Sequence, residues 1–152
     1  QARLLILGEG PEEKHLKDLA LELKIYNDVV FAGFRKNPYK YIAHSSLFVL
    51  SSVREGFGNV IVQAMACGIP VVATNDKSGP GEIIDNEING LLIEPQNLVD
   101  LSDAILKLLQ NPDFAKKLSE NGLDRSKYFT VRESVASYER LFNKLLDRPV
   151  AQ

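Results

Sequence analysis

The sequence predicts an α/β protein with a doubly wound parallel sheet and a helical extension at its C-terminal end. Two observations indicate this class. Five short apolar runs are continuous rather than alternating, as strands buried on both faces are, and amphipathic helical patterns lie between and after them. Strands that alternate with helices form parallel sheets with right-handed crossovers. The expected strands are Leu4 to Leu7, Val29 to Phe31, Leu47 to Leu50, Val71 to Ala73 and Leu91 to Ile93.

The expected helices follow from helical spacing and from their end signals. Pro11 suits a first helical turn, Asn97 suits a cap, and Thr130 with Glu133 forms a capping box. Asn111 followed by proline divides the C-terminal helical region into two pieces. Three sets of apolar residues each share one helical face: Leu16, Leu19, Ala20 and Leu23; Leu98, Leu101, Ile105 and Leu108; and Val131, Val135, Tyr138, Phe142 and Leu145.

Length and composition describe an ordinary globular chain. With 152 residues, 45% hydrophobic and 25% charged, we expect a single domain spanning residues 1–152. A net charge of -2 argues against a surface that coats nucleic acid. Cys67 is the single cysteine and, with His15 and His44, gives no ligand spacing for zinc. We therefore expect a reducing, cytoplasmic location, no nucleic-acid partner and no metal site.

Membrane and export signals are not visible in the sequence. No apolar run approaches the roughly 20 residues that a spanning helix needs. The start QARLLILGEG lacks the basic and small-residue features of a signal peptide. Because a strand begins almost at once, we expect the chain to be a fragment of a longer protein.

The first candidate loop is Gly8-x-Gly10, which follows the first strand. It is like a dinucleotide fingerprint, but the third glycine would fall at Glu13. A tight strand-to-helix turn explains two glycines equally well. Both interpretations stay open, and a nicotinamide site rests on these two glycines alone.

A second candidate loop follows the second strand and contains Gly33, Phe34, Arg35 and Lys36. Adjacent basic residues in a loop are usually solvated. Their place after a strand end keeps a ligand role open, because open α/β sheets bind ligands at the carboxyl ends of their strands.

The third candidate is Glu55-Gly56-Phe57-Gly58, directly before a helix expected over Asn59 to Cys67 and ended by Gly68 and Pro70. Glycines let backbone approach a ligand, and a helix N-terminus offers N–H groups and a positive dipole end to an anion. The pattern predicts a phosphate site without a lysine. The alternative is a turn whose glutamate is merely exposed.

A fourth loop, Ser78 to Glu82, lies between the fourth strand and a brief helix, and Asn89-Gly90 marks the turn into the last strand. The carboxyl ends of parallel strands share one rim, so the four loops predict one binding crevice. We interpret His15 and His44 as surface or packing residues and Cys67 as a small apolar core residue.

At this point the sequence resembles a known family. SSVREGFGNVIVQAMACGIPVVAT is similar to the signature of the family 4 (group 1) retaining glycosyltransferases, in which two glutamates separated by seven residues lie between a strand and a helix. LLILGEGPEEKHLKDLALEL, VVFAGFRKNPYKYIAHSSLFVLSS, SGPGEII and NGLLIEP also look like parts of that family's C-terminal half. The resemblance covers the chain through about Pro95 and a helical tail of the expected kind.

The resemblance implies a GT-B enzyme, of which this chain is the Rossmann-like, C-terminal nucleotide-sugar-binding domain. The N-terminal acceptor domain is then absent, as is an upstream Arg and Lys pair that grips the diphosphate, so the fragment should be inactive alone. The implied catalytic residue is Glu55, which contacts the donor sugar. The implied donor-binding residues are Gly8, Gly10, Gly33, Phe34, Arg35, Phe57, Gly58, Asn59, Val60 and Gln63.

Two positions depart from the family pattern. The second motif glutamate, which accepts from the ribose, is replaced by Gln63. An amide offers one acceptor oxygen and an NH2 donor, so ribose binding is expected to be weaker or differently oriented. Gly81 stands where close relatives often have an arginine.

The implied reaction transfers a hexosyl or N-acetylhexosaminyl group with retention from a nucleotide-sugar, UDP-sugar first and GDP-sugar second, to a glycan, lipid-linked or other glycoconjugate acceptor. The resemblance implies no cofactor and no obligatory metal, because metal-independent members of the family stabilise the charge on the leaving diphosphate with the helix N-terminus and the Arg and Lys pair. The lack of an Asp-x-Asp metal motif agrees with this expectation. The longer parent is expected in the cytoplasm, with peripheral contact at the cytosolic membrane face left open. The alternative function is a catalytically degenerate nucleotide-binding module, marked by Gln63.

Overall fold

The computed structural model describes residues 2–75 and 79–146. It contains two compact units, one up to Lys40 and one from Tyr41 onward. The prediction of a single domain over residues 1–152 stays a prediction.

The first unit is a two-stranded parallel sheet with one helix. Strand β1 (Leu4–Leu7) is followed by α1 (Glu13–Glu22), the 3₁₀ turn η1 (Tyr26–Asp28) and β2 (Val29–Gly33). The register pairs Leu4 with Val29 and shifts after Ile6, so that Leu7 lies opposite Gly33. The ammonium of Lys17 on α1 lies 5.4 Å from the centroid of the Phe31 ring, which places α1 against β2.

Two expectations for this unit are wrong. Leu4 and Leu5 are 53% and 40% exposed, so β1 is not buried on both faces, because a two-stranded sheet with one helix has few neighbours to cover it. Pro11 lies in a turn ahead of α1 rather than in its first helical turn. Of the expected apolar face of α1, Ala20 is buried, whereas Leu16, Leu19 and Leu23 are exposed.

The second unit contains a parallel sheet of order β3-β4-β5. Val71 pairs with Phe48 on one side, and Val72 pairs with Leu91 on the other. All four residues of β4 are buried, as a central strand requires. Helix α2 (Tyr39–Ile42) spans the boundary between the two units. The elements that follow it are β3 (Phe48–Leu50), α3 (Asn59–Ala66), β4 (Val71–Thr74), α4 (Pro80–Ile83), β5 (Leu91–Ile93), α5 (Leu98–Gln110), α6 (Pro112–Ser126), η2 (Lys127–Phe129) and α7 (Val131–Leu146).

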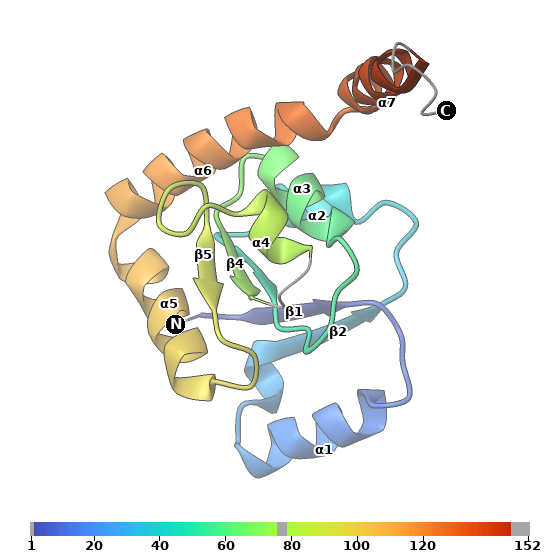
Figure 1. Cartoon of the computed structure of the whole chain (residues 1–152). Helices are drawn as coiled ribbons and strands as arrows, with labels where there is room; N and C mark the ends of the chain where they lie inside the picture. Colours follow the sequence, from blue (N-terminus) through green and yellow to red (C-terminus); the bar gives the residue numbers. More distant parts are fainter. Residues whose placement is uncertain (1, 76–78, 147–152) are drawn as a thin grey trace. The chain divides into compact units, whose positions relative to one another are not determined.

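Helices cover both faces of this sheet (Figure 1). Val71 and Ala73 of β4 point to a core that contains Ile61 and Met65 of α3. Val72 points the other way, to a core with residues of α5 and α6 such as Leu108 and Leu118. Because side chains alternate across a strand, one buried strand serves both cores. The predicted α/β class with parallel strands and helices on both faces is confirmed.

The predicted caps are also present. The Asn97 side chain accepts a hydrogen bond from the Asp100 amide at 3.1 Å. At the predicted break the Asn111 side chain accepts from the Phe114 amide at 3.0 Å, a cap that was not predicted. Asn111 thus ends α5 and starts α6. The hydroxyl of Thr130 accepts from the Glu133 amide at 3.3 Å ahead of α7. In the described ranges, no helix has both the length and the apolar content needed to cross a membrane.

Candidate functional site

The third candidate loop ends at the start of α3, as its glycines predicted. Gly58 is the N-cap residue of α3, with φ +86° and ψ +47°. Few residues other than glycine adopt this left-handed conformation. A β-carbon on Gly58 would also lie 3.0 Å from Cδ1 of Ile61. No side chain caps α3 at this end, so the first-turn N–H groups and the positive dipole end suit an anion.

The predicted side chains of this loop lie around that helix end. Glu55 is half-buried, and its Cγ lies 3.5 Å from the position that a β-carbon on Gly58 would take. Asn59 and Val60 form the exposed first turn of α3, and Gln63 is half-buried one turn further along. The structure therefore brings Glu55, the helix N-terminus and Gln63 into one local region of the second unit.

Phe57 anchors the loop to the core. Its ring is partly buried against the cluster that contains Ile61 and Met65. It meets the ring of Phe129 edge-on, with centroids 5.6 Å apart and an interplanar angle of 65°. This geometry is a favourable one for aromatic pairs. The ring therefore contributes to the fold and holds the backbone at Phe57 and Gly58 in place.

The start of the loop is held by β4. The hydroxyl of Thr74, which is buried, donates to the carbonyl of Ser52 and lies 3.4 Å from the carbonyl of Leu50. Leu50 is the last residue of β3, so the side chain of Thr74 continues the contact between the two strands beyond their paired residues.

The segment before α4 packs on the same loop. Gly79, at φ +71°, is so close to it that a β-carbon would lie 2.6 Å from the Gly56 carbonyl oxygen and 2.9 Å from Phe57 Cα. The fourth candidate loop is thus brought to the third. Glu82 on α4 is exposed, and a β-carbon on Gly81 would lie 3.1 Å from the side-chain oxygen of Asn75. Ser78 lies outside the described residues.

In the first unit, the structure brings the first two candidate loops together. The Gly8 amide donates to the Gly33 carbonyl at 3.0 Å, and the Phe34 amide donates to the Glu9 carboxylate at 3.1 Å. Gly8 and Gly33 both have positive φ. The turn interpretation of the first loop is therefore supported by direct contacts. Gly10, Phe34 and Arg35 are exposed.

The residues interpreted as structural have the expected surroundings. His15 is exposed, with its ring nitrogen 3.2 Å from the carboxylate of Glu12, and His44 is exposed. Cys67 packs partly buried against the core near α3. Within residues 2–75 and 79–146, His, Cys, Asp and Glu side chains form no group of three or more suited to a metal ion.

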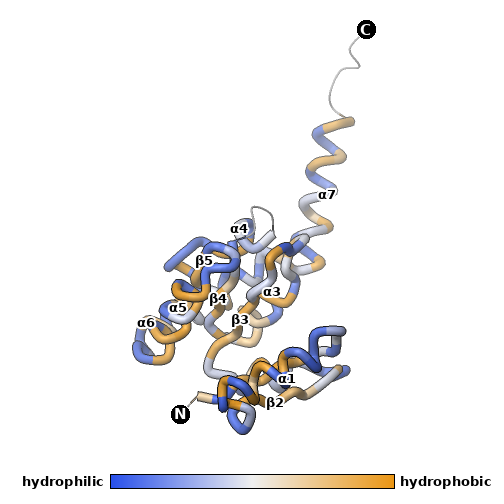
Figure 2. The backbone as a smooth tube through the Cα atoms, turned by 90° about the horizontal axis from the view of Figure 1, so that it is seen from below, coloured by the Kyte–Doolittle hydropathy of each residue, from blue (hydrophilic) through white to orange (hydrophobic). Residues whose placement is uncertain are grey.

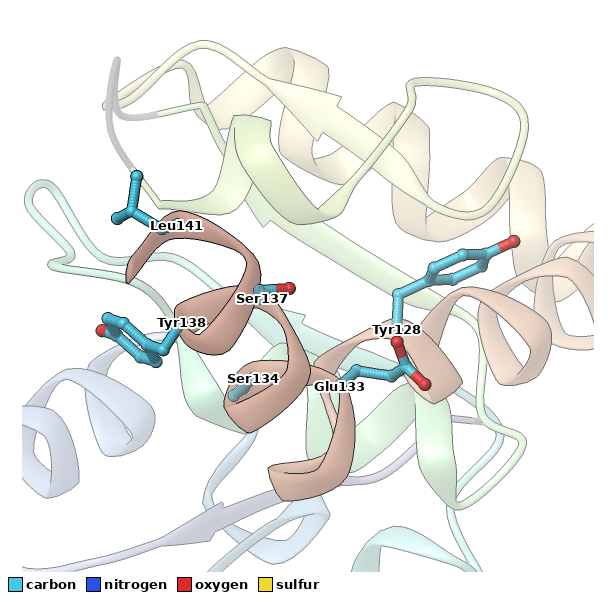
Figure 3. A pocket seen from close by; sticks show the side chains of 6 residues that line it. All are labelled: Tyr128, Glu133, Ser134, Ser137, Tyr138 and Leu141. Atoms are coloured by element: carbon cyan, nitrogen blue, oxygen red, sulfur yellow. The ribbon is translucent and has the colours of Figure 1, made fainter. Parts of the chain in front are cut away.

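Two surface pockets of the second unit lie away from these residues. One is lined by Tyr128, Glu133, Ser134, Ser137, Tyr138 and Leu141, from η2 and α7 (Figure 3). The other lies near Gly68, Pro70 and Pro112, at the opposite ends of the strands from the candidate loop. Neither is lined by a predicted site residue.

Among the residues that the structure describes, two side chains have shifted pKa values, and both are remote in sequence from the candidate loop. A hydrogen bond with Glu13 raises the pKa of Lys17, and a hydrogen bond from Lys107 lowers the pKa of Glu87. Both pairs are surface ion pairs.

Several contacts of the site were not predicted. Sequence reasoning placed Gly79 in the fourth candidate loop but gave no sign of its contact with Gly56 and Phe57. It also missed Thr74 and Phe129. These residues are up to 72 positions from Phe57 along the chain, and no local spacing links them.

Comparison with known proteins decides the family. Residues 1–125 match the model of the group 1 glycosyl transferases. The chain belongs to this family. The predicted resemblance is thereby confirmed at the level of group 1, and the narrower assignment to family 4 stays a prediction. The glycosyltransferase family leaves the nicotinamide alternative without support.

The curated relatives are longer proteins. One is an uncharacterized glycosyltransferase of Methanocaldococcus jannaschii, 32% identical, with 92% of this chain and 41% of that protein covered. Another is the N-acetylgalactosamine-N,N'-diacetylbacillosaminyl-diphospho-undecaprenol 4-alpha-N-acetylgalactosaminyltransferase of Campylobacter jejuni, 36% identical, with 84% of this chain and 35% of that protein covered. The chain therefore spans well under half the length of these glycosyltransferases.

Solved structures agree with this family. The Anabaena protein HepE, solved in complex with UDP, matches with a TM-score of 0.83 and 28% identity, covering 93% of this chain and 41% of that chain. HepE has also been solved with UDP-glucose. The Rossmann-like α/β fold of the glycosyltransferase domain is confirmed.

Proposed function

We propose that this chain is the donor-binding part of a retaining glycosyltransferase that transfers a hexosyl or N-acetylhexosaminyl group from a nucleotide-sugar. The observation that carries the proposal is the juxtaposition of Glu55 with the glycine-capped N-terminus of α3. The helix end suits the diphosphate, and the carboxylate of Glu55 suits sugar hydroxyls, which donate hydrogen bonds to it.

The assignment of roles follows from this geometry and from the family. The diphosphate is assigned to the backbone N–H groups at Phe57, Gly58, Asn59 and Val60, and the ribose to Gln63. The contacts proposed for Gly8, Gly10, Gly33, Phe34 and Arg35 of the first unit, toward the nucleotide, rest on the resemblance alone. Glu55 is the proposed catalytic residue because it would touch the reacting sugar.

The donor is proposed to be a UDP-sugar, and the solved complexes of HepE with UDP and UDP-glucose support this choice. A GDP-sugar is the second candidate. A transferred sugar leaves a nucleoside diphosphate, so negative charge develops on the β-phosphate as the anomeric C–O bond breaks. The dipole of α3 and the N–H groups of its first turn would stabilise that charge, so no cofactor and no obligatory metal are proposed.

The acceptor is proposed to be a glycan or a lipid-linked glycoconjugate, bound by a separate N-terminal domain of the longer protein. The Campylobacter jejuni relative is named for a diphospho-undecaprenol substrate. Such a substrate would place the parent in the cytoplasm, with peripheral contact at the cytosolic face of a membrane. The chain by itself is then expected to bind the donor without transferring the sugar.

Calorimetric titration of the chain with UDP, GDP, ADP and NAD, at low salt and with or without magnesium, tests the proposal. Selective binding of UDP that does not depend on magnesium is the expected result. Selective binding of GDP would move the donor to the second candidate, and preferred binding of NAD would contradict the proposal.

The second candidate function, a catalytically degenerate nucleotide-binding module, is favoured by the amide at Gln63 in place of the family's carboxylate. The longer parent protein, assayed for transfer and hydrolysis with common nucleotide-sugars, separates the two. Turnover of any donor supports the enzyme, and nucleotide binding without turnover of any donor supports the degenerate module.

A further inference from the structure

Arg125, near the C-terminal end of α6, reaches a helix that lies more than forty residues earlier in the chain. Its Nη2 donates to the carbonyl of Glu82 at 2.8 Å, and its Nε donates to the carbonyl of Ile83 at 3.1 Å. Both carbonyls lie at the end of α4, where backbone acceptors have no partner within the helix. One planar guanidinium therefore fixes the C-terminal end of α4 through two neighbouring carbonyls.

The same guanidinium lies against two aromatic rings. Its Cζ is 5.1 Å from the centroid of Phe129 and 5.9 Å from that of Tyr128. An arginine at these distances is attracted by the ring faces. Phe129 in turn meets Phe57 edge-on at 5.6 Å. The side chain of Arg125 thus links α4 to Phe129, the ring that packs against Phe57 in the third candidate loop.

The N-terminal end of α4 also contacts the loop that contains Phe57. Gly79, the N-cap residue of α4, packs directly on the backbone of Gly56 and Phe57. Phe57 is therefore held from two directions: its backbone by the start of α4, and its ring by Phe129. Arg125 is joined to both, through the end of α4 and through the Phe129 ring.

From these contacts among Arg125, α4, Phe129 and Phe57 we infer that Arg125 is a positioning residue for the proposed donor site. It sets the backbone of residues 56–58, and through it the N–H groups at the start of α3, without touching the donor. A residue that only capped α4 would explain the two carbonyl contacts. It would not require the guanidinium to lie on the ring that packs against Phe57. The effect on donor binding rests on the proposed function of the loop.

Three variants test the inference. Arg125→Gln removes the positive charge and the planar guanidinium with its paired donors. Arg125→Lys keeps the charge, but an ammonium cannot donate to both carbonyls and also lie over the Phe129 ring. Phe129→Leu keeps an apolar side chain but removes the aromatic face. The matched control is Arg140→Gln, which removes a guanidinium from exposed α7, where its Nη2 bonds Ser137.

Each variant is measured in two ways, well below its unfolding temperature. The first measurement is the amide chemical shifts and hydrogen exchange of Gly56, Phe57 and Gly58 in the ligand-free chain, by NMR. The second is UDP affinity by calorimetry. We expect shifted signals and faster exchange at these amides, and UDP affinity lowered about threefold to tenfold, for both Arg125 variants and for Phe129→Leu. Arg140→Gln should leave both measurements unchanged.

The outcomes separate this inference from the proposed function. A lower unfolding temperature with unchanged amide signals and unchanged UDP affinity would mean that Arg125 only caps α4, and the inference would be overturned. If Arg125→Gln does not fold, Arg125→Lys and Phe129→Leu decide by the same two measurements. If the unaltered chain binds no nucleotide, the proposal that this chain binds the donor by itself fails, and the amide signals alone then decide whether Arg125 positions residues 56–58.

Discussion

The backbone of Phe57 lies directly against Gly79, so closely that a β-carbon on Gly79 would be 2.9 Å from both Cα and the carbonyl oxygen of Phe57. The contact joins two loops that follow neighbouring strands, β3 and β4. It leaves no room for any side chain at position 79, because all three of the nearest atoms are backbone atoms that cannot rotate away.

Gly79→Ala should lower the free energy of unfolding by about 2–4 kcal/mol, because the new β-carbon clashes with the backbone and the alanine is held at a positive φ. Chemical denaturation followed by circular dichroism measures the change. Gly56→Ala is the matched control, since a β-carbon there meets nothing within 4 Å, and its effect should stay within about 0.5 kcal/mol. Equal losses in the two variants would contradict the role of this contact.

Glu55→Ala should weaken the binding of a nucleotide-sugar far more than that of the free nucleotide. Hydrogen bonds to a charged group contribute about 1.5–3 kcal/mol, which corresponds to about 10- to 100-fold in affinity for UDP-glucose. The affinity for UDP should hardly change. Calorimetric titration of the variant with both ligands checks this. Equal losses for both would refute the proposed contact between Glu55 and the sugar.

Gln63→Glu should strengthen nucleotide binding. A carboxylate accepts from both ribose hydroxyls, whereas the amide offers one acceptor oxygen, and a difference of about 1 kcal/mol corresponds to about fivefold in affinity. UDP and uracil titrations distinguish the effect, because uracil carries no ribose. An unchanged affinity for UDP would argue against the assignment of the ribose to position 63.

Glu87→Gln should remove a pH-dependent part of the stability. Lys107 Nζ lies 2.5 Å from the Glu87 carboxylate and lowers its pKa in the folded chain. Because the pKa of Glu87 is lower in the folded chain than in the unfolded chain, the ion pair stabilises the fold at pH values above the unfolded pKa. This stabilisation is lost as the pH falls through the pKa of the folded chain.

The unfolding temperature of Glu87→Gln should therefore lie slightly below that of the unaltered chain at neutral pH and meet it in acid. Salt should narrow the difference, because both side chains are about half exposed. Glu120→Gln is the control, because the carboxylate of Glu120 lies 3.8 Å from Lys116 on the surface of α6. A difference that persists in strong acid would contradict the ion pair as its cause.

Much of the fold could be predicted because its signals are local. The strand at Leu91 to Ile93 has the predicted bounds, and the helical region divides at Asn111 as predicted, with Pro112 as the first residue of α6. A capping side chain and the amide that it binds are three residues apart, so the sequence places them together. The helix start after Gly58 is also predictable from local sequence, because glycine is accepted at an N-cap position without a capping side chain.

The supports of the candidate site could not be predicted because they join distant parts of the chain. Arg125 contacts carbonyls 42 and 43 positions away, and the hydroxyl of Thr74 lies against a carbonyl 22 positions away. Arginine and threonine are common surface residues, and the residues next to Arg125 and Thr74 in the sequence do not indicate that these two side chains make long-range contacts. The left-handed residues Lys24, Glu87 and Gln96 were likewise not expected, since they carry side chains.

Helix α7 has 16 residues and no buried side chain, and apolar residues recur along it (Figure 2). Neighbouring rings of Tyr138 and Phe142 lie 6.2 Å apart along its surface. A helix of this length is marginally stable in water when no core supports it. Its opening should therefore cost much less free energy than global unfolding. Brief digestion of the folded chain with trypsin should cleave first after Arg132, Arg140 and Lys144. The β3-β4-β5 sheet and the helices that cover it should remain as a resistant core.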